Sequence, residues 1–276
     1  MFLKQSPSLL ISLPMVAFML TGVARAADLD QGDSPALSNW YQSYKPTEND
    51  WNIAVGAGVM YAPKYEGSDN FGAIPIPDIS VEYKDGLFFA NAFDGIGSYF
   101  LQGEQYKVGA SIGFDLGRRE KDDKKNLRGM GNIEMSPTAN LMGEYKFGPV
   151  QLSGKISRGS EDYGTTGEFD VGTMVPVTEK LMLMGSVGAT VADDAHMKSF
   201  FGVSAAQSAA SGYSKYDAGA GVKSVGVALG AFYSLSDHWD AKLLVKADHL
   251  LGDAADSPIT KQEFQPAVMF STSYKF

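Results

Sequence analysis

Two residue types that often carry nucleophilic or metal chemistry, cysteine and histidine, are absent or rare in this 276-residue chain. It contains no cysteine, and its three histidines, His196, His238 and His249, stand far apart in the sequence. Metal centres and activated nucleophiles need several ligating or proton-accepting groups that converge. The sequence therefore predicts no metal site, no cofactor and no catalytic residue.

Charged side chains form a second group of candidates, because they recur at alternate positions of segments whose other positions are apolar. They are Asp78, Glu82, Lys107, Asp115, Glu144, Lys146, Lys155, Asp170, Asp240, Lys242, Lys246 and Asp248. If these side chains line an open pore, their opposed charges favour the passage of small solutes. If they pair with one another, they hold a water-bearing interior together instead. We favour the paired interior and leave the pore open as the alternative.

A locally basic segment stands out in an acidic chain. Residues 118–128 include Arg118, Arg119 and Arg128, whereas the whole chain carries a net charge of -9. Guanidinium groups bind phosphate in a bidentate geometry. The segment is thus a candidate for phosphate contacts, and the alternative is a solvated loop of mixed charge.

Composition excludes two large classes of protein. The 32 acidic residues outnumber the 23 basic ones, which argues against nucleic-acid binding. A mean hydropathy of -0.12 excludes a bundle of transmembrane helices, each of which needs about 20 consecutive apolar residues. The first 26 residues resemble a cleaved export signal, with Lys4, an apolar stretch at 9–20 and the small-residue site Ala24-Arg25-Ala26.

From residue 51 onward, apolar and polar side chains alternate with a period of two. In 51–61 one face is apolar and carries Trp51 at one end and Tyr61 at the other, as strands that join two membrane interfaces do. In 239–249 the second face carries Lys242 and Lys246. A lysine on the lipid face near mid-bilayer costs about 2–4 kcal/mol. The lysines must therefore face a wet interior, and the apolar face must touch lipid.

The alternation predicts twelve strands, at 51–61, 74–83, 87–92, 95–101, 106–117, 135–147, 150–158, 168–177, 181–191, 217–234, 239–250 and 263–276. Short links alternate with longer polar ones at 62–73, 118–134, 159–167, 192–216 and 251–262, as periplasmic turns and extracellular loops do in outer-membrane barrels. The two strands within 87–101 are short. If they form no hairpin, the number of strands is ten.

The expected fold is an all-β, transmembrane, antiparallel up-and-down barrel over 51–276. In lipid every backbone N–H and C=O needs a partner, so a sheet must close on itself. The last segment alternates up to Phe276, which resembles the terminal signature of barrels inserted into the outer membrane of Gram-negative bacteria. Residues 27–50 are expected to form a mobile periplasmic arm, and 205–210 one or two helical turns.

Several loop motifs resemble those of the MipA/OmpV family of outer-membrane proteins, over about residues 51–276. They are Tyr65-Glu66-Gly67-Ser68-Asp69, Gly117-Arg118 with Leu127-Arg128-Gly129-Met130-Gly131, Phe201-Gly202-Val203-Ser204 with Ser211-Gly212-Tyr213, and the segment 252–258. The resemblance implies a scaffold that docks a murein lytic transglycosylase to a penicillin-binding protein during peptidoglycan synthesis. It supplies no catalytic residues. The alternative function is a passive channel for small polar solutes.

An outer-membrane location gives two further hypotheses a concrete form. The phosphate groups that Arg118, Arg119 and Arg128 contact would be those of lipopolysaccharide. Some outer-membrane barrels hydrolyse lipids with a serine and a histidine near the outer rim, and His249 has the outward parity at that end of its strand. Because no serine partner can be assigned to His249, we expect a protein that is not an enzyme.

Overall fold

A computed structural model describes residues 50–160 and 163–276 of the chain. The expected signal segment 1–26 and, apart from residue 50, the expected periplasmic arm 27–50 lie outside these residues. None of the helices in the described part is long and apolar enough to cross a membrane.

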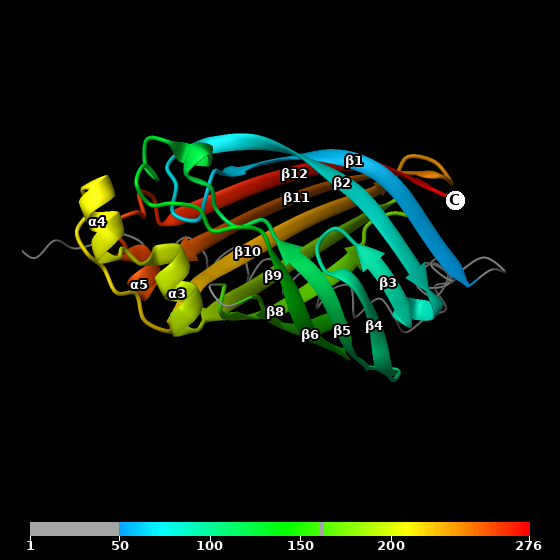
Figure 1. The fold of residues 1–276 in the computed structure, drawn as a ribbon. Coiled ribbons are helices and arrows are strands. Elements are labelled where there is room, and N and C mark those ends of the chain that lie inside the picture. Colours follow the sequence, from blue (N-terminus) through cyan, green and yellow to red (C-terminus); the bar gives the residue numbers. More distant parts are fainter. Residues whose placement is uncertain (1–49, 161–162) are drawn as a thin grey trace, which may run out of the picture. The chain divides into compact units, whose positions relative to one another are not determined.

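Twelve antiparallel strands close into a barrel in which sequence neighbours pair and the last strand pairs with the first (Figure 1). The strands are β1 (Trp51–Pro63), β2 (Phe71–Tyr83), β3 (Phe88–Asn91), β4 (Gly95–Gln102), β5 (Tyr106–Asp115), β6 (Ser136–Phe147), β7 (Val150–Arg158), β8 (Thr165–Pro176), β9 (Leu181–Ala192), β10 (Gly221–Ser234), β11 (Trp239–Leu250) and β12 (Phe264–Lys275). The predicted fold and the predicted twelve strands are confirmed.

The period-two alternation separates the two faces of the wall. Val55, Val59 and Leu243, which share the apolar parity, are 45%, 46% and 43% exposed on the outside of the barrel. Exposed apolar rows of this kind are stable against hydrocarbon, whereas water would penalise them. The opposite parity faces the interior.

Barrel closure depends on a tight seam between β1 and β12, which pair from Ala54 opposite Lys275 to Tyr61 opposite Val268. Gly56 and Gly58 lie on the interior face of β1. A Cβ atom at Gly56 would collide with the backbone of Thr272 and Ser273, and one at Gly58 with the backbone of Phe270. The two glycines therefore let the terminal strands approach each other closely.

The β3–β4 hairpin forms, but it is much shorter than its neighbours. β3 has four residues and β4 has eight, against 13 for β2 and ten for β5. The turn at 92–94 therefore lies part-way up the wall. The η1 turn (Lys84–Gly86) joins β2 to β3 at the opposite, periplasmic end.

The long loops fold into a structured cover at the outer end of the barrel, which we call the lid and define as 64–70, 116–134, 193–220 and 251–263. It contains η2 (Glu120–Asp123), α3 (Asp194–Phe201), α4 (Ala205–Ser211) and α5 (Gly252–Ala255), and α3 to α5 gather at one end of the barrel in Figure 1. Helical turns were expected only at the position of α4. Met130, Val203 and Ile259, from three different lid segments, pack into one buried cluster.

β10 begins four residues later than predicted because the preceding residues belong to the lid. Ala218 is fully buried among lid residues. The backbone N–H groups of Gly219 and Ala220 donate to Asp253 at 2.7 Å and to Asp194 at 2.7 Å. These carboxylates satisfy donors that a strand neighbour would otherwise take.

Candidate functional site in the barrel interior

A direct ion pair crosses the interior between strands that are not neighbours. Lys242 Nζ on β11 donates to Asp78 Oδ1 on β2 at 2.8 Å, and Ser271 Oγ on β12 donates to Asp78 Oδ2 at 2.8 Å. β1 and β12 lie between the two paired strands. Side chains can meet over intervening strands only on the concave side of a barrel, so Asp78 and Lys242 face the interior.

Further polar contacts join side chains in the half of the interior that is nearest the short turns. Tyr99 on β4 donates its hydroxyl to Glu144 on β6 at 2.9 Å. Lys107 Nζ donates to the backbone O of Asp85 at 2.8 Å, and Glu82 lies within electrostatic range of Lys107 and Glu144.

Two more groups of ion-paired side chains lie elsewhere in the interior. Asp240 pairs with Lys275 at 3.1 Å. Lys155 lies 3.7 Å from Asp94 and 3.5 Å from Glu168. Lys146, opposite Gln151 on β7, completes the inward row of β6.

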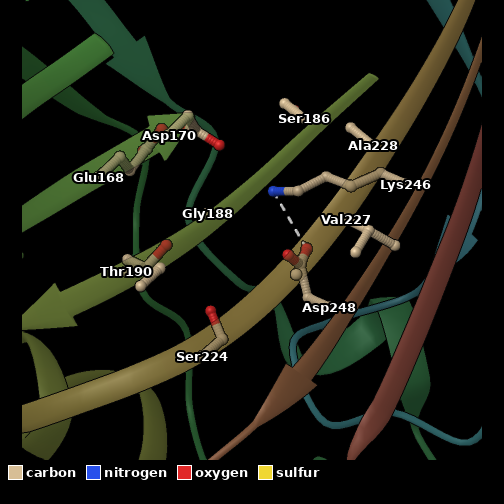
Figure 2. A pocket seen from close by; sticks show the side chains of 12 residues that line it. Glu168, Asp170, Ser186, Gly188, Thr190, Ser224, Val227, Ala228, Lys246 and Asp248 are labelled. Carbon is tan, nitrogen blue, oxygen red and sulfur yellow. Dashed lines mark ion pairs between the residues drawn. The ribbon is translucent and has the colours of Figure 1, made fainter. Parts of the chain in front are cut away.

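A cavity of about 30 Å³, the size of a water molecule, lies among charged side chains of β8 and β11 (Figure 2). Lys246 pairs with Asp248 at 3.0 Å, while Asp170 and Glu168 approach from β8. A Cβ at Gly188 or Gly226 would occupy the space of the Asp170 or Asp248 carboxylate, so these glycines make room for the acids.

The twelve charges predicted for the interior are therefore brought into several small groups rather than one ring. Three further members were missed: Asp94, Glu168 and Lys275. Glu168 and Lys275 have the inward parity of their strands, so their spacing could have identified them. Asp94 lies in a turn, where parity gives no information.

An ion pair whose lysine is buried under the lid was missed for a different reason. Lys223 Nζ contacts Glu66 Oε1 at 2.7 Å, and Lys223 is only 8% exposed. By strict alternation Lys223 would face lipid. The register between β9 and β10 shifts between Val222 and Ser224, so Lys223 is the extra residue of a β-bulge, which redirects its side chain inward.

Arg118 lies beneath the lid rather than on its surface. It is 4% exposed, and its Nη1 donates to the backbone O of Phe200 at 2.6 Å. Burial lowers its pKa to about 10, while Tyr65 and Glu66 oppose that shift. The expectation that Arg118 faces outward to lipopolysaccharide is therefore wrong, because the lid folds over its side chain. Arg119 and Arg128 are exposed and border a surface hollow with Lys121 and Lys124.

His196, on α3 of the lid, is buried. Its Nδ1 lies 3.0 Å from the backbone O of Tyr163, whose hydroxyl donates to Asp115 Oδ2 at 2.8 Å. Burial and then the charge of Lys223 lower the pKa of His196, so the ring is neutral at pH 7.

The other two histidines lie near the ends of strands. His238 Nδ1 lies 3.2 Å from the backbone O of Lys275, and His249 lies 3.4 Å from Glu263. In residues 50–160 and 163–276 there is no cluster of three or more metal-ligating side chains.

A carboxylate holds two lid segments together. Asp123 Oδ2 accepts hydrogen bonds from Ser68 Oγ at 2.9 Å, Asn70 Nδ2 at 2.9 Å and Asn126 Nδ2 at 3.0 Å. Burial alone would raise the pKa of Asp123, but these hydrogen bonds outweigh it and lower the pKa. We call this set the lid clasp.

A closed barrel with an apolar exterior and a polar, ion-paired interior defines an outer-membrane β-barrel protein. The chain belongs to the MipA family: the family model described as "MltA-interacting protein MipA" matches residues 55–276. This confirms the resemblance seen in the loop motifs, and the protein is located in the outer membrane. No curated protein matches the chain.

Solved outer-membrane proteins resemble the chain only distantly. OmpT of Vibrio cholerae is 9% identical, with a TM-score of 0.35 over 82% of this chain and 97% of its own. The NanC porin is 8% identical, with a TM-score of 0.39 over 82% and 100%. The channel DcaP of Acinetobacter baumannii is 9% identical, with a TM-score of 0.36 over 84% and 99%. Similarities this distant do not define a function.

Proposed function

We propose that the protein is a non-enzymatic scaffold that docks peptidoglycan-synthesising and lytic enzymes at the outer membrane. The description of its family as MltA-interacting supports a murein-enzyme partner. The observation that carries the proposal is the interior, where charged side chains such as Asp78 and Lys242 pair with one another below a lid that packs its own hydrophobic cluster. Charges that are paired in this way favour a function on a face of the barrel over ion conduction.

The docking face in this proposal is periplasmic, where murein enzymes work. It comprises the short turns between strands and the arm 27–50, which contains Trp40, Tyr41 and Tyr44. Aromatic side chains are common anchors of protein interfaces, so these three aromatic residues of the arm are its candidate contacts.

Affinity capture from detergent-solubilised envelopes tests the scaffold. The expected result is recovery of a lytic transglycosylase together with a penicillin-binding protein. A variant lacking 28–50 then separates the arm from the turns, and Lys215→Glu, on the exposed surface of the lid, is the control. If neither enzyme is recovered with the full chain, the scaffold is wrong.

A passive channel remains the second candidate, because charged side chains and a water-sized cavity line the interior. Discrete conductance steps of reproducible size in planar bilayers would favour it over the scaffold.

We also propose that Arg119 and Arg128, at the exposed hollow of the lid, bind the phosphates of lipopolysaccharide. Reversing both arginines to Glu should reduce the lipopolysaccharide that co-purifies with the protein. Unchanged lipid content would refute this contact.

A further inference from the structure

The wall of the barrel is incomplete on one side, in the half that faces the outer leaflet. β3 pairs with β2 only from Ser80 to Tyr83. From Phe71 to Ile79, β2 therefore has β1 on one side and, among the described residues, no strand partner on the other.

The far border of this interruption is β5. β4 pairs with β5 as far as Ile112, opposite Ile96, so Gly113–Asp115 pair only with β6. Between the turn at 92–94 and the lid, no strand in the described chain pairs β2 with β5. We call this interruption the wall gap. The lid clasp spans its top, since Ser68 and Asn70 precede β2 and Asp123 follows β5.

The amino-acid sequence of β2 is adapted to an unpaired edge. Phe276 N donates to Ile53 O on the β12 side, and Lys84 N donates to Asp50 O on the β2 side, so even-numbered residues of β1 and β2 bond to each other. The odd-numbered Pro75 and Pro77 therefore direct their backbone nitrogens at the wall gap. Proline has no N–H to leave unpaired, which is why it is tolerated at sheet edges.

The rim of the wall gap is apolar. Phe93 of the hairpin turn is 65% exposed, Phe114 and Leu116 on the β5 side are 67% and 72% exposed, and Ile79 on β2 is 44% exposed. Hydrocarbon is the medium that such side chains favour. Lipid chains of the outer leaflet are thus the natural neighbours of this opening.

Inside the barrel, an apolar row begins at the wall gap and crosses seven neighbouring strands. Each member lies opposite the next in the strand register: Ile74, Met60, Met269, Leu244, Gly230, Met184 and Met174. All have the inward parity. Six strand spacings of about 4.8 Å make the row about 29 Å long. It ends at Met174, two residues before β8 reaches its periplasmic end at Pro176.

The row is packed at its centre, where Met269 is 7% exposed, and leaves apolar surface open at its ends. Leu244 and Met184 converge on Gly230, where a Cβ would lie 2.8 Å from Leu244 Cδ2 and 3.3 Å from Met184 Cβ. Ile74 and Met174, at its two ends, remain 38% and 47% exposed. Exposed apolar area inside a polar, hydrated barrel costs about 25 cal/mol per Å². Methionine side chains adapt their shape to a flexible partner.

We propose that the apolar row binds the hydrocarbon chain of a single-chain amphiphile, such as a fatty acid, that enters from the outer leaflet through the wall gap. The site is independent of the scaffold function, since it uses the interior and one side of the wall rather than the periplasmic face. It is also independent of ion conduction, because the Asp78–Lys242 pair stays in place beside the row.

Photolabelling of the full chain in phospholipid nanodiscs tests the binding site. The probe is palmitate with a diazirine at the end of its chain, and labelled residues are mapped by mass spectrometry. We expect labels on inward residues such as Met60, Leu244 and Met184, and competition by unlabelled palmitate. Leu244→Glu should reduce that labelling by about tenfold or more, because a charged carboxylate in the row is unfavourable next to an alkyl chain even with Lys242 and Lys246 on either side of it.

Gln151→Glu is the matched control, because it adds the same charge inside the barrel on β7, which the row does not reach. Should Leu244→Glu fail to fold, Met184→Gln, which keeps the length of the side chain, replaces it. Labels confined to lipid-facing residues, or undiminished by substitution in the row, would overturn the proposal. Competition by a lysophospholipid but not by palmitate would still support a single-chain ligand and would identify its head group.

The wall gap has its own test, for which the absence of cysteine is useful. Nitroxide labels are attached to single cysteines at Ile76→Cys, inward beside the gap, and at Ala228→Cys, inward on the intact wall. Molecular oxygen concentrates in lipid, so electron paramagnetic resonance should show a higher oxygen accessibility at residue 76 than at residue 228. Equal accessibility would show that lipid does not reach the interior.

Discussion

Asp123 illustrates how much of the lid depends on one carboxylate. Its partners Ser68 and Asn126 are 0% and 4% exposed, so neither can turn to water if the carboxylate is removed. The two segments joined by the lid clasp also form the top border of the wall gap. The same contacts therefore determine both the order of the lid and the size of the opening below it.

Replacing Asp123 by alanine should destabilise the lid without unfolding the barrel. Each buried donor left without an acceptor costs about 1–3 kcal/mol. Protease added to outer-membrane vesicles should cut 64–70 and 116–134 faster in Asp123→Ala than in the wild type. Asp122→Ala, which removes a neighbouring carboxylate paired with exposed Arg119, is the control. Equal cleavage of Asp123→Ala and the wild type would contradict the clasp.

The lid should also respond to acid in a defined direction. Because the folded-state pKa of Asp123 lies below its ordinary value of 3.8, the clasp stabilises the lid above that pH. Its contribution is lost as the pH falls through the lower, folded-state value. Hydrogen exchange of 64–70 in the wild type and in Asp123→Asn should therefore differ at pH 6 and converge as the carboxylate is protonated. A difference that stays constant while the carboxylate is titrated to its protonated form would exclude this mechanism.

At the scale of the elements, the seam between β1 and β12 leaves little room for added volume at Gly56. The collision at Gly56 is with backbone atoms of β12, which cannot rotate away as a side chain can. The seam is also the only pairing that joins the two ends of the strand sequence. Loss of this pairing would open the barrel.

Gly56→Ala should lower the free energy of unfolding by about 1–3 kcal/mol, the usual cost of overpacking. Urea unfolding in lipid vesicles, followed by tryptophan fluorescence, measures this change. Gly221→Ala is the matched control, since a Cβ at Gly221 has no neighbour within 4 Å. Similar midpoints for both variants would show that the seam accommodates a methyl group.

The strands could be predicted because the membrane enforces a single rule on every one of them. Twelve strands and the inward parity of Lys242 follow from the cost of placing a charge in lipid. This rule gives no information about residues outside the regular membrane-spanning strands. Strand alternation does not predict the position of Lys223, because a bulge shifts the register there. It does not predict the burial of Arg118, because the lid has no periodic pattern, or the position of Asp94, because Asp94 lies in a turn. These residues are placed by tertiary packing, which local alternation does not encode.

At the scale of the whole molecule, side chains and the lid, and not the diameter of the barrel alone, restrict passage through the interior. Ion pairs join side chains of strands that are not neighbours, such as β2 and β11, and the lid packs its own hydrophobic clusters above them. Both features favour a protein that acts at its surfaces. They do not prevent access from the side, where the wall gap lies.

The full chain should therefore show no discrete channels in planar bilayers. Replacing 194–216 by a short glycine-serine linker should raise the conductance, because it removes α3 and α4 from the outer mouth. A linker of the same kind in place of the exposed periplasmic turn 178–180 is the control. Steady wild-type channels would instead favour the passive-channel function.

The pairing of β12 with β1 also constrains how the protein can be made. Ala54 meets Lys275 only after more than two hundred intervening residues have been synthesised. Until then both end strands keep unpaired edges, and such edges invite aggregation. The nascent polypeptide therefore has to be protected from aggregation while it crosses to the membrane, and the circle of hydrogen bonds can be completed only once β12 has been made.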